Sequence, residues 1–147
     1  MRIPPSLKVV LVILWALAIP ALSLLPPRFF HDLFASSAAT VPGTDKIVHA
    51  AMYAILTGLM LWALNRPDRR LGVRAIWDAA VLAALYGALM EALQGWSHAV
   101  LHRSADPWDE FANAAGAALV ACLWLLFRSR RSTTPRMSAG SGRSKII

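Results

Sequence analysis

The sequence has few of the residues that a water-soluble protein displays on its surface. Charged residues make up 16% of its 147 positions, acidic residues occupy only eight of them, and 57% of the positions are hydrophobic. This composition excludes an ordinary water-soluble domain and favours an integral membrane protein. The single cysteine, Cys122, excludes an internal disulfide, and the apolar run around it predicts a small buried side chain.

Motifs of common enzymes and of nucleic-acid-binding proteins are also absent from the sequence. The chain has no G-x-S-x-G, no H-E-x-x-H and no P-loop. Its net charge of +7 would indicate a nucleic-acid partner in a soluble protein. Here the basic residues flank apolar segments, so membrane topology and anionic lipid headgroups explain them better, and no nucleic-acid partner is expected.

Four apolar segments are long enough to cross a hydrocarbon core. Their expected bounds are Leu7–Leu25, Lys46–Leu64, Ala75–Gly95 and Trp108–Phe127. A cleaved signal peptide is the alternative for the first segment, but its apolar stretch is longer than a usual signal core, which favours a retained helix that Pro20 kinks or ends. The expected fold is an all-α membrane protein, a bundle of four transmembrane helices.

Basic residues orient this expected bundle. Twelve of the fifteen Lys and Arg residues lie at the N-terminus, between the second and third spans, or after the fourth span. The positive-inside rule therefore places both termini in the cytoplasm and the 26–45 and 96–107 loops outside. The first outer loop contains "RFFHDLF", which predicts a short interfacial helix. Residues 1–131 form one expected membrane domain, and residues 132–147, rich in Ser, Arg and Gly, form an expected disordered cytoplasmic tail.

Polar residues recur at helical spacing near the expected outer ends of three spans. These stripes are Asp45, His49 and Tyr53 on the second span, Gly87, Glu91 and Gln94 on the third, and Asp106, Asp109, Asn113 and Gly116 on the fourth. The spacing places each stripe on one helix face. Ionisable groups at this depth are expected to face the bundle interior and pair with one another, with Lys46 and Arg103 supplying positive charge.

Helix capping is an alternative explanation for some of the acids. "DPWD" is a favourable helix start, with Asp106 as N-cap and Asp109 three residues later, and Asp45 is favoured by the dipole of the second span. For Asp106 and Asp45 we prefer capping to chemistry. Asp109 and Arg103 stay open between a functional role and a structural ion pair that ties two spans together.

The remaining residues of the stripes also divide into structural and functional candidates. Tyr53 is interpreted as an interior packing residue with a hydrogen-bonded hydroxyl, and Gly87 and Gly116 as points of close helix contact. Glu91 lies within an apolar span and caps nothing obvious, so it is the strongest functional candidate. No metal centre or cofactor is expected, because His98 and His102, although four residues apart, lie in a loop where histidines are usually solvated.

Together the three stripes resemble the VanZ-like family of small bacterial membrane proteins. That family has Asp-Lys followed by His and Tyr on one helix face, a helix with Glu and Gln, and then R-x-x-D-x-x-D-x-x-x-N-x-x-G. The matching residues here are Asp45, Lys46, His49, Tyr53, Glu91, Gln94, Arg103, Asp106, Asp109, Asn113 and Gly116. The resemblance implies a multi-pass protein of the bacterial inner (cytoplasmic) membrane and, in the named member, low-level resistance to teicoplanin. It supplies no catalytic reaction and favours a housekeeping role in the cell envelope.

Two functions fit this cluster. In the first, which we prefer, the matching residues other than Gly116 bind a lipid headgroup, a lipid-linked cell-wall precursor or a lipoglycopeptide, with Lys46 and Arg103 meeting phosphate or carboxylate. In the second, a membrane enzyme modifies an isoprenoid or phospholipid headgroup, with Glu91 or Asp109 as base and His49 as proton shuttle. A third reading makes the cluster a purely structural lock between helices.

Overall fold

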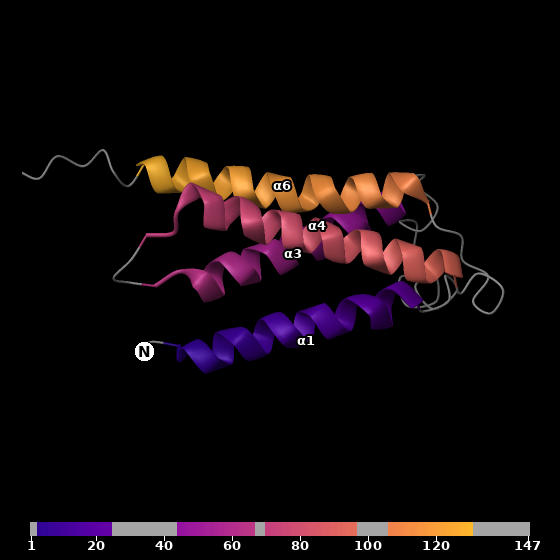
Figure 1. Cartoon of the computed structure of the whole chain (residues 1–147), viewed down its shortest axis with the longest axis horizontal. Coiled ribbons are helices and arrows are strands. Elements are labelled where there is room, and N and C mark those ends of the chain that lie inside the picture. Colours follow the sequence, from indigo (N-terminus) through magenta and orange to yellow (C-terminus); the bar gives the residue numbers. More distant parts are fainter. Residues whose placement is uncertain (1–2, 25–43, 67–69, 97–105, 131–147) are drawn as a thin grey trace, which may run out of the picture.

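The protein structure, a computed structural model, describes residues 3–24, 44–66, 70–96 and 106–130. Within these ranges the chain forms helices and no strand. The helices are α1 (Pro5–Leu24), α3 (Thr44–Leu64), α4 (Val73–Trp96) and α6 (Pro107–Arg130) (Figure 1). Each is long and apolar enough to cross a membrane, which confirms the predicted all-α fold with four candidate spans.

Helix α1 continues through Pro20, so the expectation that Pro20 could end the first span is wrong. A proline inside a helix has no N–H to donate to the carbonyl four residues earlier, here that of Ala16. The hydroxyl of Tyr86 on α4 donates to this Ala16 carbonyl oxygen over 2.7 Å. A neighbouring helix therefore satisfies the acceptor that Pro20 leaves open, as helices in a membrane require.

Helix α3 contacts each of the other three helices, and its most extensive contact is with α6. Successive helices run in opposite directions, so α3 and α6 run parallel to each other (Figure 1). A Cβ atom on Gly116 of α6 would lie 2.0 Å from the carbonyl oxygen of Ala50 on α3. The glycine thus permits the close approach of these two backbones that its position in the sequence predicted.

Alanines occupy part of the bundle interior beside larger apolar side chains, while many other large apolar side chains face outward. Ala83, Ala117 and Ala121 are buried, whereas Leu85 and Phe127 are more than half exposed. This distribution suits a protein surrounded by lipid. Cys122 is exposed on this outer surface, so the expectation of a buried cysteine is wrong. It follows the buried Ala121 on α6 and therefore points away from the helix face that packs inward.

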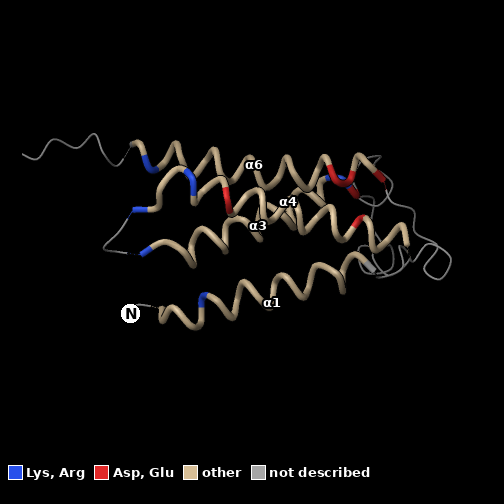
Figure 2. Tube along the Cα trace, viewed as in Figure 1, with Lys and Arg blue, Asp and Glu red and all other residues tan. Residues whose placement is uncertain are grey.

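The charges of the described residues separate along the bundle, as Figure 2 shows. At one end, where α1 and α4 begin, lie Lys8, Arg66, Arg70, Arg74 and Arg128, with Asp78 nearby; we call it the basic end. At the other end, where α3 and α6 begin, lie Asp45, Glu91, Asp106, Asp109 and Glu110, with Lys46; we call it the acidic end. By the positive-inside rule, the basic end is predicted to face the cytoplasm.

Candidate functional site at the acidic end

The start of α3, the start of α6 and the last turns of α4 meet at the acidic end (Figure 1). The N-terminus of a helix carries a partial positive charge and favours acidic side chains. Asp45 lies in the first turn of α3, and Asp109 and Glu110 lie in the first turn of α6. The gathering of acids therefore has a local cause in two parallel helices that begin side by side.

Lys46 connects these two helix starts. Its Nζ atom lies 2.9 Å from Asp106 Oδ2 and 3.1 Å from Asp109 Oδ1, and 3.4 Å from Asp45 Oδ2. A lysine ammonium has three N–H donors, so three carboxylates account for all of them. The Lys46 ammonium therefore joins the first turn of α3 to the start of α6, as the predicted pairing of charges requires.

Asp106 is the N-cap of α6. Its Oδ1 atom accepts the N–H of Trp108 over 3.0 Å, and its backbone oxygen accepts the N–H of Asp109 over 2.9 Å. The Lys46 ammonium, helped by the Trp108 amide, holds the pKa of the Asp106 carboxyl below its usual range. The backbone N–H of Asp106 itself donates to Glu91 Oε2 on α4 over 3.2 Å. Glu91, which caps nothing obvious in the sequence, thus supports the start of another helix.

His49 and Asn113 form the most deeply buried polar contact of the site. They are 8% and 1% exposed, and His49 Nδ1 lies 3.1 Å from Asn113 Oδ1. Asn113 Nδ2 donates to Glu110 Oε2 over 3.4 Å, so the Asn113 oxygen faces the imidazole. With the Asn113 oxygen as acceptor, Nδ1 of His49 is the donor in this contact.

The His49 imidazole lies between two carboxylates. Its Nδ1 atom is 4.0 Å from Glu91 Oε1, and its Nε2 atom is 3.8 Å from Asp109 Oδ2. The other oxygen of Asp109 contacts Lys46, and the other oxygen of Glu91 accepts the Asp106 amide. Each carboxylate thus uses one oxygen to hold helices together and turns the other toward His49.

This arrangement has the donor atoms of a metal site and the groups of an acid–base pair. One ligand atom from each of His49, Glu91 and Asp109 lies within 4.8 Å of the others. A tetrahedral zinc site with bonds of about 2.1 Å would place its ligand atoms about 3.4 Å apart, so the three side chains would have to move closer to hold such an ion. Without an ion, the imidazole can exchange a proton with a ligand that enters between the carboxylates.

Other residues of the predicted cluster lie elsewhere. Gln94 Nε2 donates to the Ser23 carbonyl oxygen on α1 over 3.3 Å, so this side chain joins α4 to α1. Tyr53 lies deeper in the bundle, 1% exposed, with its ring centroid 6.4 Å from that of Tyr86. Arg103 lies outside the described residues, as do "RFFHDLF", the tail from residue 132 and the histidines of the loop before α6.

Glu110 is a residue of the candidate site that the sequence-based prediction did not include. Its Oε2 atom binds Asn113, and a Cβ atom on Gly87 would lie 3.0 Å from that same oxygen. Gly87 therefore lets α4 approach α6 closely, as its sequence position predicted. The spacing contained the signal, because Glu110 precedes Asn113 by three residues and so shares its helix face.

Comparison with known proteins adds no further identification. The chain matches no protein-family model, no curated protein and no solved structure. Membership of the VanZ-like family therefore rests on the motifs of the sequence and stays a prediction. What the described structure establishes is a bundle of four candidate membrane spans with a buried polar cluster at one end.

Proposed function

We propose that this chain is a VanZ-like integral membrane protein of the bacterial cell envelope that binds the headgroup of a lipid or of a lipid-linked cell-wall precursor at its acidic end. The observation that carries the proposal is the pair of carboxylate oxygens, one from Glu91 and one from Asp109, turned toward the buried imidazole of His49. Ionisable groups at membrane depth are costly, and those that do more than pair helices mark functional sites.

The contacts of Lys46 narrow the chemistry of the ligand. Three carboxylates engage its ammonium, so the sequence-based idea that Lys46 meets a phosphate receives no support from its geometry. Apart from Lys46, the Lys, Arg, Asp and Glu residues described at the acidic end are all acidic. The site therefore favours a ligand that donates hydrogen bonds, such as an ammonium, hydroxyl or amide headgroup. A lipoglycopeptide also carries such donors beside an acyl chain. Binding of a lipoglycopeptide at this site would connect the protein with teicoplanin resistance.

A membrane enzyme that modifies an isoprenoid or phospholipid headgroup is the second candidate. The placement of His49 between Glu91 and Asp109 favours it, because an imidazole that faces two carboxylates can pass a proton between a ligand and a base. Turnover of a lipid substrate, abolished by Glu91→Gln in a folded protein, would establish the enzyme. Binding without turnover would establish the first function.

Native mass spectrometry of the protein released from lipid nanodiscs tests the proposal. Glu91→Gln is the sharpest variant, because a glutamine oxygen still accepts the Asp106 amide while the negative charge is lost. We expect wild type to retain a defined lipid that Glu91→Gln loses. Asp78→Asn is the matched control, since it removes an exposed acid at the basic end and should leave retention unchanged.

Three other results would redirect the assignment. A retained mass that fits a divalent ion, removed by chelator and absent from Asp109→Asn, would make the cluster a metal centre. Equal lipid retention by wild type, Glu91→Gln and Asp109→Asn would contradict headgroup binding. Loss of thermal stability in both variants, with no ligand on wild type, would leave the structural lock as the role of the cluster.

A further inference from the structure

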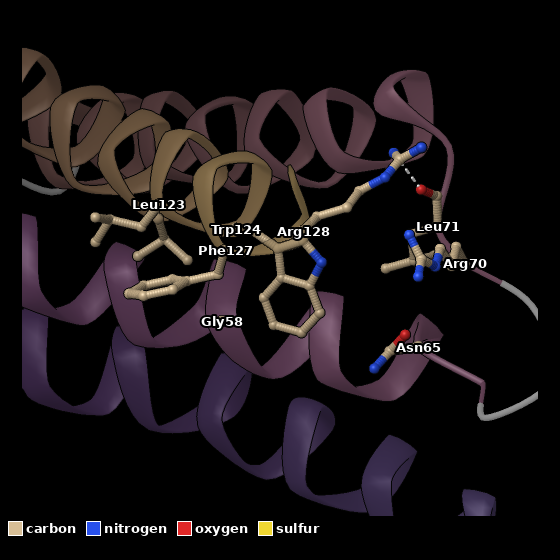
Figure 3. Close-up of a pocket in the computed structure, with 9 residues that line it drawn as sticks. Gly58, Asn65, Arg70, Leu71, Leu123, Trp124, Phe127 and Arg128 are labelled. Atoms are coloured by element: carbon tan, nitrogen blue, oxygen red, sulfur yellow. Dashed lines mark hydrogen bonds between the residues drawn. The ribbon is translucent and has the colours of Figure 1, made fainter. Parts of the chain in front are cut away.

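A hollow lies at the basic end of the bundle, opposite the acidic end, and the function proposed above does not use it. It is a groove of about 520 Å³ between α3 and α6 (Figure 3). Val120, Leu123, Trp124 and Phe127 of α6 form its apolar wall, and Gly58 of α3 lines it where a larger residue would intrude. The wall runs along the membrane-spanning part of α6, so it lies at the depth of lipid acyl chains.

The rim of the groove is polar and positively charged. Arg70, Arg128 and Asn65 line it at the level where α3 and α6 end. The Arg128 guanidinium donates to the carbonyl oxygen of Leu71, which holds it at the rim (Figure 3). A guanidinium has five N–H donors, and this contact uses one of them. A smaller adjoining hollow of about 310 Å³ shares Arg70 and Leu71 and adds Arg66.

We propose that this groove binds an anionic phospholipid, with the phosphate at Arg70 and Arg128 and an acyl chain along the α6 wall. Arginine is suited to phosphate because its planar fork can donate two parallel hydrogen bonds. Lys8 and Arg66 lie at the same end and add to the positive potential. Basic pockets between membrane helices on the cytoplasmic side recognise anionic headgroups by this combination of charge and apolar wall.

Charge argues against the two other occupants that the groove could accept. Residues 131–147 contain Arg131, Arg136, Arg143 and Lys145 and no acidic residue, so the basic rim repels this segment. A second copy inserted in the same orientation would bring its own basic end to the same side of the membrane. An anionic lipid is the membrane component whose charge complements the rim.

The test compares the binding of phosphatidylglycerol and phosphatidylcholine to the full chain in detergent by native mass spectrometry. We expect wild type to bind phosphatidylglycerol in preference, and Arg70→Gln and Arg128→Gln each to weaken that binding about tenfold, the effect of losing one charge-assisted contact. Arg74→Gln is the matched control, because Arg74 is an exposed arginine at the same end that lies outside the groove. It should bind phosphatidylglycerol as wild type does.

A second variant tests the acyl-chain part without removing charge. At Gly58 the nearest atom that a Cβ would meet is Val120 Cγ1, at 3.9 Å, so alanine fits and leucine extends into the groove. Gly58→Leu should lose phosphatidylglycerol while Gly58→Ala keeps it, and both should melt as folded proteins. Glu91→Gln should leave this binding unchanged, which separates the groove from the site at the acidic end.

Four results would overturn the proposal. They are equal binding of the two lipids, an equal loss in Arg74→Gln, displacement of the lipid by millimolar inorganic phosphate, and retention by Gly58→Leu. If the protein binds phosphatidylglycerol only after residues 131–147 are removed, this segment is the occupant of the groove. A wild-type dimer that excludes the lipid would identify a second copy.

Discussion

Lys46 Nζ on α3 lies 3.1 Å from Asp109 Oδ1 on α6, in the first turns of two parallel helices. Parallel helices that begin side by side place two partial positive charges next to each other. The acids in both first turns offset this charge, and the Lys46 ammonium then joins the carboxylates across the gap. At the acidic end, one cation is therefore shared among acids from two helices.

Replacement of Lys46 tests this joint. Lys46→Ala should lower the melting temperature in detergent, because Asp106 and Asp109 lose their shared partner while staying close to each other. Lys46→Arg should retain most of the stability, since a guanidinium can bridge the same oxygens. Equal melting of wild type and Lys46→Ala would show that the Lys46 contacts do not stabilise the bundle.

Gly116→Ala should push α3 and α6 apart. The new Cβ would lie 2.0 Å from the Ala50 carbonyl oxygen, which is backbone and has no rotamer with which to move away. We expect a loss of about 1–3 kcal/mol in the free energy of unfolding, the usual cost of overpacking. Gly58→Ala is the control, because its Cβ finds ordinary contact at 3.9 Å and alanine favours a helix over glycine. A destabilised Gly58→Ala would show that any added methyl group is costly here.

Asn113→Ala should change the protonation pattern of His49. Loss of the Asn113 oxygen removes the acceptor that fixes the proton on Nδ1, and one buried polar group loses its partner. The cost is about 1–3 kcal/mol in unfolding free energy. ¹⁵N chemical shifts of the imidazole in labelled protein report the tautomer, and wild type should show Nδ1–H. An Nε2–H signal in wild type would contradict the network that joins His49, Asn113 and Glu110.

Acid should remove the contribution of the Asp106 carboxylate to the stability of the fold. Its folded-state pKa is lowered by Lys46, so its carboxylate stabilises the fold fully above the ordinary pKa of about 3.9 and loses this effect as pH falls through the lowered value. Asp106→Asn keeps an N-cap side chain but carries no charge. The melting temperature of wild type should exceed that of Asp106→Asn near neutral pH, and the difference should shrink below about pH 4. A difference that persists in acid would exclude the ion pair as its source.

Tyr86→Phe should destabilise the bundle, because Pro20 leaves a helix carbonyl oxygen that only the Tyr86 hydroxyl satisfies among the described contacts. The Tyr86 hydroxyl satisfies the Ala16 carbonyl oxygen that the proline cannot reach, so its loss should cost about 0.5–1.5 kcal/mol. In a Pro20→Ala background the helix N–H returns to Ala16, and the same change should cost less. A double-mutant cycle measures this coupling, and additive effects would show that the two sites act independently.

Some roles in the site can be predicted from the sequence and others cannot, because only the first depend on residues that adjoin one another in the chain. Asp106 as N-cap follows from residues that adjoin it in the chain, so "DPWD" was sufficient to predict it. Glu91 as acceptor for the Asp106 amide depends on how far α4 extends beside α6, which no local pattern encodes. Gln94 shares a stripe with Glu91, yet it contacts the end of α1 because that helix also borders α4.

Amino-acid sequence alone determined the candidate spans, the two charged ends and the helix faces on which polar residues gather. Hydropathy, charge and helical period are properties of neighbouring residues, so they can be read before the chain folds. Tertiary structure decided which carboxylates share Lys46, which oxygens face His49, and where the basic end leaves a groove. These depend on the pairing of α3 with α6, and that close approach depends on the missing side chain of Gly116 against the Ala50 backbone.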